Sequence, residues 1–190
     1  MNIFNKMSGK WVSESAEDMG NGTFCTREFK FKNNEWQILF TLFLDNELKM
    51  PVFTFRGLGH FVVEEVSSVV AGAYNTLFYF SSKYVTLKTN NEEILKNFGF
   101  AESGLVIDVE KDISQTGVSF LPAVRYYGQE YDLVKIEGEK LYLGMRSNDM
   151  SSEDKRPTAL FYPLIRKTEV VDHDTYAGKC FAIINVKIHD

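Results

Sequence analysis

The sequence predicts a single domain of the all-β class, an antiparallel β-barrel with one short helix. Three observations favour this fold. Aromatic residues make up 14% of the chain, with 16 Phe and 9 Tyr, and aromatic side chains favour strands. Several segments alternate apolar and polar residues with a period of two, as half-buried strands do. About eight to ten such segments follow one another with turn residues between them, which favours a barrel or sandwich over an α/β fold.

The clearest strands lie in the first half of the chain. Residues 26–32 place Phe29 and Phe31 on one face, and residues 36–44 return from a turn at Asn33 as the second arm of a hairpin. The next strand, residues 52–66, contains Gly57 and Gly59, and this spacing indicates a bend or a bulge. Further strands are expected over residues 73–89, either as one bent strand or as two short ones, and over residues 103–114.

A helix candidate is followed by a hairpin in the second half of the chain. The best helix candidate covers residues 90–100, where Asn91 can cap and Gly99 can end the helix. The hairpin covers residues 126–146, with its turn at Glu-Gly-Glu-Lys. Late strands are expected within residues 156–167 and 179–188, and residues 147–157 are polar enough for a surface loop.

Length, charge and cysteine content narrow the class of protein. A chain of 190 residues suits one domain with a substantial core. The net charge is 21 − 26 = −5, which argues against binding the phosphates of nucleic acids. No apolar run approaches the ~20 residues that cross a bilayer, and the first residues lack the apolar centre of a signal peptide. We therefore expect a cytoplasmic protein in which Cys25 and Cys180 are free thiols.

Gly9-Lys10-Trp11 matches the Gly-x-Trp signature of lipocalins and other calycins, and a longer series of motifs resembles one family. This series is similar to the lipocalin-like domain of the adenomatosis polyposis coli down-regulated protein family, over residues 8–167. The positions that carry the resemblance are Gly9, Trp11, Ser13, Glu17, Arg27, Phe29, Trp36, Asp45, Pro51, Gly59, Asp132, Leu141, Gly144, Arg146, Arg156, Pro157, Pro163 and Arg166. The resemblance implies a β-barrel with an apolar cavity suited to lipid-like ligands, in which Arg166 covers Trp11 at the closed end. Residues 168–190 form an extension beyond it.

The chain departs from this family at two positions. Family members carry one cysteine just before the position of Glu17 and another three residues before that of Pro51, and these places here hold Ala16 and Leu48. Loss of this pair is expected for a protein that lives without disulfides. A secreted signalling role is therefore not transferred to this chain.

Candidate binding residues follow from the strand pattern and from the resemblance. The apolar candidates either line a cavity or belong to a filled core, and the resemblance favours a cavity: Phe40, Leu42, Phe53, Phe55, Leu77 and Tyr79. Arg125, beside Tyr127, is the preferred partner for an anionic head group. Gly9, Trp11 and Arg166 are expected to be structural residues at the barrel end.

The expected function is non-catalytic binding of a small apolar or amphipathic ligand, without a cofactor or metal. The sequence holds no phosphate loop, nucleophile elbow or zinc motif. One alternative is a calycin that acts as an enzyme or binds haem, for which His60 could be the axial ligand. A second alternative is a protein-interaction module whose barrel interior is filled.

Overall fold

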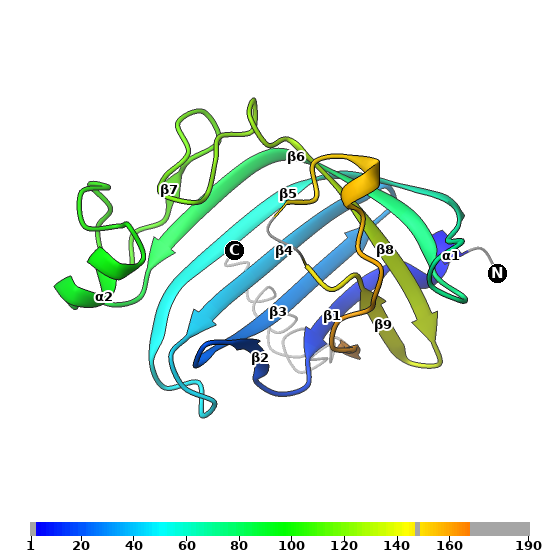
Figure 1. Ribbon diagram of the computed structural model, residues 1–190, viewed down its shortest axis with the longest axis horizontal. Helices are drawn as coiled ribbons and strands as arrows, with labels where there is room; N and C mark the ends of the chain where they lie inside the picture. The colour runs from blue at the N-terminus through cyan, green and yellow to red at the C-terminus, as the bar shows by residue number, and fades with distance from the viewer. Residues whose placement is uncertain (1–2, 147–148, 168–190) are drawn as a thin grey trace, which may run out of the picture.

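Eight strands close into an antiparallel barrel in which neighbouring strands of the ring pair with each other (Figure 1). The computed structural model describes residues 3–146 and 149–167. The barrel strands, in ring order, are β1 (Gly9–Ser13), β3 (Thr23–Lys32), β4 (Glu35–Phe43), β5 (Pro51–Val66), β6 (Tyr74–Leu87), β8 (Gln129–Glu137), β9 (Lys140–Leu143) and β10 (Leu164–Lys167). Because β1 pairs with both β3 and β10, the sheet closes on itself. The predicted fold class, an all-β antiparallel barrel, is confirmed.

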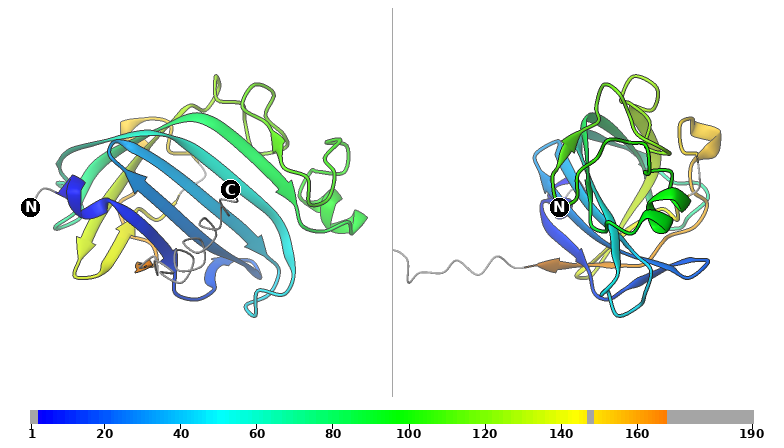
Figure 2. Two further views of the ribbon diagram at one scale, coloured as in Figure 1. Left: turned by 180° about the vertical axis from the view of Figure 1, so that it is seen from behind. Right: turned by 90° about the vertical axis from the view of Figure 1, so that its left-hand side faces the viewer.

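Short elements decorate the barrel. The strand β2 (Glu17–Gly20) pairs with β3, and β7 (Lys111–Asp112) pairs with β6. The helices are α1 (Ile3–Met7), α2 (Glu92–Asn97) and the 3-10 turn η1 (Glu153–Lys155). The two α-helices lie at opposite ends of the barrel, and the end-on view shows α2 beside one opening (Figure 2).

Local sequence explains the hairpins that connect consecutive strands. Asn33, at φ 56°, stands in the two-residue turn between β3 and β4, where a left-handed conformation suits Asn. The carboxylate of Asp45 accepts the backbone N–H groups of Lys49 and Met50 and so orders the turn between β4 and β5. Gly138, at φ 60°, begins the turn between β8 and β9. These turns set the register of the predicted hairpins.

A β-bulge interrupts the ladder between β5 and β6. The pairing shifts between Leu58 and Gly59, which face Ser82 and Phe80, so that Ser81 is the extra residue. A Cβ at Gly59 would lie 1.8 Å from the carbonyl oxygen of Tyr79, so only glycine fits. Because one residue is added, side chains of β6 change faces across the bulge.

Apolar side chains fill the two ends of the barrel as separate clusters. Residues of α1 pack on the first cluster, where Phe4 stacks on Phe61 at 5.3 Å between ring centroids. Residues of α2 pack on the second cluster, in which Phe53 contacts the fully buried Phe100 at 5.4 Å. Phe55 packs against both clusters. The middle of the barrel therefore lies between two separate apolar cores.

The helix predicted over residues 90–100 is present as α2, and Asn91 caps it by accepting the N–H groups of Glu93 and Ile94. No sequence pattern indicated α1, because its five residues are too few for a periodic pattern. The strand expected over residues 103–114 is reduced to β7. The strand expected over residues 179–188 lies outside the described residues. No described helix is long and apolar enough to cross a membrane.

Candidate functional site

The Gly-x-Trp motif closes one end of the barrel. Trp11 has no exposed surface, and its indole N–H donates to the carbonyl of Met7 at 2.7 Å. The guanidinium of Arg166 lies 4.2 Å from the ring centroid and donates to the carbonyls of Lys6 and Ser8. Gly9, at φ 119°, leaves the space for this guanidinium, because a Cβ there would lie 2.7 Å from it. The three residues thus form the structural barrel end that the resemblance implies.

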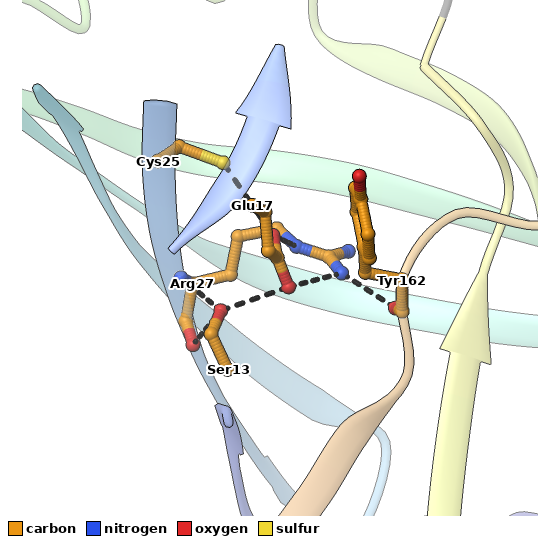
Figure 3. A network of polar contacts seen from close by, with 5 residues as sticks. All are labelled: Ser13, Glu17, Cys25, Arg27 and Tyr162. Carbon is orange, nitrogen blue, oxygen red and sulfur yellow. Dashed lines mark hydrogen bonds and ion pairs between the residues drawn. The ribbon is translucent and has the colours of Figure 1, made fainter. Parts of the chain in front are cut away.

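A buried polar network closes the barrel where the backbone ladder of β1 ends at Ser13 (Figure 3). The guanidinium of Arg27 donates to both carboxylate oxygens of Glu17, at 2.7 and 3.0 Å, and to the carbonyl of Tyr162 at 2.8 Å. Arg27 and Glu17 are 8% and 2% exposed. The pair therefore ties β2 and β3 to the segment before β10, across a gap that β1 does not span.

The remaining partners of this network keep both charges satisfied. The hydroxyl of Ser13 lies 2.9 Å from Glu17 and also accepts the backbone N–H of Arg27. The thiol of Cys25 donates to Glu17 at 3.4 Å. Burial, together with the charge of Glu17, raises the pKa of Cys25 to about 12. Because only a thiolate is a good nucleophile, Cys25 is suited to packing and not to catalysis.

The middle of the barrel interior is the candidate binding site, and we call it the mid-barrel site. Its apolar wall consists of Ile38, Phe40 and Phe55, which share the inward face with the buried Phe29 and Phe53 in the strand registers. All three wall residues are only half-buried. They point into the barrel and pack against the two end clusters, yet part of their surface stays accessible to solvent. Partly exposed aromatic and aliphatic carbon on an inward face suits an apolar ligand.

Lys83 adds a cation to the inward face beside this wall. It pairs in register with Gly57, which itself pairs with Ile38, so the three positions form one row across the sheet. Lys83 is 3% exposed, and its ammonium donates to the carbonyls of Pro122 and Tyr127. Burial lowers its pKa to about 8. The sequence pattern missed Lys83 because lysine is almost never fully buried without a charged partner, so it was not considered as an interior residue.

The apolar residues predicted from the sequence divide between the two faces of the barrel. Phe40, Leu42, Phe53 and Phe55 face inward, as expected, and pair in register with one another. Leu42 and Phe53 belong to the cluster beneath α2, whereas Phe40 and Phe55 reach the mid-barrel site. This placement brings four of the six predicted apolar residues together.

The expectation that Leu77 and Tyr79 face the interior is wrong. They pair with Val62 and His60, whereas the inward residues of this part of β6 are Phe78 and its neighbours of even number. The physical reason is the bulge, since the pattern of odd inward positions that holds at Val85 does not continue past it.

The expectation that Arg125 meets a head group inside the barrel is also wrong. Arg125 is exposed and lies over the ring of Tyr126, which is itself 71% exposed. Tyr127, its predicted neighbour in the site, is half-buried; its hydroxyl accepts the N–H of Met150 and its carbonyl binds Lys83. The turn at residues 123–127 therefore directs Arg125 to solvent and Tyr127 towards the barrel.

His60 lies on the outer face, where its ring stacks on Tyr79 at 4.5 Å. An outward histidine cannot be the interior axial ligand that the haem alternative requires. His60 instead borders an open outer groove of about 690 Å³, together with Lys30, Lys32 and Gln37. In the described ranges, no three His, Cys, Asp or Glu side chains gather as metal ligands would.

The later motif positions form a second buried junction. Asp132 accepts the N–H groups of Leu133 and Gly144, and a Cβ at Gly144 would lie 2.5 Å from that carboxylate. Arg156 donates to the carbonyls of Thr76 and Asp132 and pairs with the carboxylate of Glu64. Burial raises the pKa of Asp132 to about 7. These contacts fasten the segment before β10 to β6 and β8.

A comparison with protein families matches the N-terminal half of the chain. The model of the family described as adenomatosis polyposis coli down-regulated 1 matches residues 1–101, which is more than half of the chain. The chain belongs to this family. The matched part runs from α1 through β6 and α2 and includes the barrel-end residues Gly9 and Trp11 and the buried pair Glu17 and Arg27.

Proposed function

We propose that this family member is a lipocalin-like, non-catalytic binding protein for a small apolar or amphipathic ligand, which it holds in the mid-barrel site. The observation that carries the proposal is the half-exposure of Ile38, Phe40 and Phe55 on the inward face, between two buried clusters. An apolar ligand that covers these side chains gains about 25 cal/mol for each Å² of apolar surface removed from water.

The architecture supports the same function. Up-and-down barrels of eight strands are the scaffold on which lipocalins hold one small ligand. One end is closed by Trp11 and Arg166, and the seam is fixed by Arg27 and Glu17. A rigid wall with few polar groups is what a preformed apolar site requires, since little ordering is then needed upon binding.

A neutral apolar dye, N-phenyl-1-naphthylamine, tests the proposal by fluorescence titration. We expect one saturable site. Ile38→Trp places a larger ring in the mid-barrel site and should abolish dye binding. Leu39→Trp is the matched control, because Leu39 is the next residue of β4, is also half-buried and faces outward with Arg56. Circular dichroism of both variants verifies that they are folded, since an added ring costs about 1–3 kcal/mol when it overpacks.

Two results would overturn the proposal. The first is an absence of saturable binding by folded protein, which would favour an interaction module with a filled interior. The second is equal loss of binding in Ile38→Trp and Leu39→Trp, because the dye would then report no specific interior site.

A further inference from the structure

Lys83 differs from the other buried or half-buried cations of the barrel in having no carboxylate partner. Arg27 pairs with Glu17 and Arg156 pairs with Glu64, while the exposed Arg146 pairs with the buried Glu130. No carboxylate of residues 3–146 and 149–167 lies within ion-pair distance of the Lys83 ammonium. The charge of Glu130 acts on it from beyond ion-pair distance, but that carboxylate is itself paired with Arg146. The direct contacts of the ammonium are two carbonyl dipoles and the rings of Phe80 and Tyr127, at 4.6 and 5.2 Å.

An ammonium has three N–H donors, and the carbonyls of Pro122 and Tyr127 accept two of them. Within the described chain, the third has no hydrogen-bond acceptor. A buried cation without a counter-ion is costly, and an anion that reaches it gains a strong hydrogen bond in a medium of low dielectric constant. Lys83 thus offers one charge and one free donor.

The position of Lys83 relates this charge to the mid-barrel site. Lys83, Gly57 and Ile38 form one row across the inward face, with Gly57 in the middle. The ring of Phe80 occupies the space over Gly57, at 2.6 Å from where a Cβ would stand, and it also contacts Phe55. The ring of Phe80 therefore contacts both Phe55 of the apolar wall and the ammonium of Lys83.

We propose that Lys83 binds the anionic head group of an amphiphilic ligand whose apolar chain lies against Ile38, Phe40 and Phe55. This inference rests on the proposed function and names the ligand class: a long-chain monocarboxylate. One charge and one free donor match a carboxylate better than a phosphate monoester, which carries nearly two charges and needs several donors. Lys83 takes the role that the sequence had suggested for Arg125.

A matched pair of ligands tests this inference directly. Palmitate and its methyl ester share one apolar chain and differ in charge, and their affinities are measured by displacement of N-phenyl-1-naphthylamine. We expect the protein to prefer palmitate. Lys83→Met keeps the length of the side chain and should weaken palmitate by about ten- to a hundredfold, the worth of a hydrogen bond to a charged group, while the ester is unchanged. Arg125→Leu, which removes an exposed cation, should change neither affinity.

The pH dependence of the unaltered protein gives a second measurement that does not depend on a variant. The charged groups near Lys83 are Glu130 and Arg146, and burial raises the pKa of Tyr127 above its usual value. Around this site, Lys83 is therefore the group whose pKa lies near 8. The preference for palmitate over its ester should be constant between about pH 6, above which the carboxyl group of palmitate is ionised, and about pH 8. It should fall by up to about tenfold per pH unit above that value, as the ammonium loses its proton.

The outcomes separate the two proposals. Saturable binding of both ligands with equal affinity, or a preference that Lys83→Met and pH leave unchanged, would overturn the assignment of Lys83 and leave the binding function intact. Failure of the dye and of both ligands to bind folded protein would overturn the binding function and the assignment with it.

Discussion

Replacing Arg27 by methionine tests whether the buried ion pair holds the seam of the barrel. The change removes the two N–H groups that bind Glu17 and the one that binds the carbonyl of Tyr162. Glu17, 2% exposed, would stay buried with only the Ser13 hydroxyl and the Cys25 thiol as partners. Breaking a buried pair in this way costs about 3–5 kcal/mol, so we expect a loss of that size in the free energy of unfolding.

The double variant Arg27→Met with Glu17→Leu removes both charges together. Because no unpaired charge remains, we expect it to lose about 1–3 kcal/mol, mainly for the polar groups of Ser13 and Tyr162 that lose a partner. Urea unfolding at 25 °C and pH 7, followed by circular dichroism, measures each variant. The reasoning is refuted if Arg27→Met costs less than about 1 kcal/mol, or if the double variant is less stable than Arg27→Met.

Three further predictions concern other buried groups. The raised pKa of Asp132 means that the folded state favours its protonated form, so its contribution to stability is complete below pH about 4 and is lost as pH rises through about 7. Asp132→Asn should therefore gain stability relative to the parent as pH rises from about 4 to about 7, and a constant difference in urea unfolding over this interval would contradict this. Trp11→Ala should cost about 3–5 kcal/mol in the same assay, and a variant as stable as the parent would show that Trp11 does not close the barrel. In a Cys180→Ser background, Cys25 should not react with a thiol reagent at pH 8 in the native state and should react fully in urea, whereas fast native labelling would contradict its burial.

Local patterns predicted most of the barrel. Alternation around Phe29 and Phe31 placed β3, the Asn33 turn placed the first hairpin, and Asn91 placed α2, because each depends on neighbours within a few residues. Which residues of β6 face inward depends instead on a bulge, in which Ser81 has no register partner on β5. Its partner strand lies more than twenty residues earlier in the chain, around Gly59.

The candidate site was predicted in part for the same reason. Phe40 and Phe55 follow unbroken alternation in β4 and on the N-terminal side of the bulge in β5, and their inward direction was predicted correctly. Lys83 was missed because a lysine is seldom buried without a charged partner, so alternation alone does not select it as an interior residue. Arg125 was selected for its tyrosine neighbours, but a turn directs it to solvent. Seam contacts such as that of Arg27 with Tyr162 join residues more than a hundred positions apart, which no local pattern reveals.

The pairing of β1 with β10 has a consequence for how the chain reaches its native state. Trp11 and Arg166 are register partners, yet most other ladders join strands adjacent in the chain. During synthesis, a meander from β1 to β9 can form early, but its edges at β1 and β9 stay unpaired until β10 has been made. Edge strands of this kind recruit other chains. The interval before closure is therefore when the protein is most exposed to aggregation, and slow closure would favour chaperone binding over native assembly.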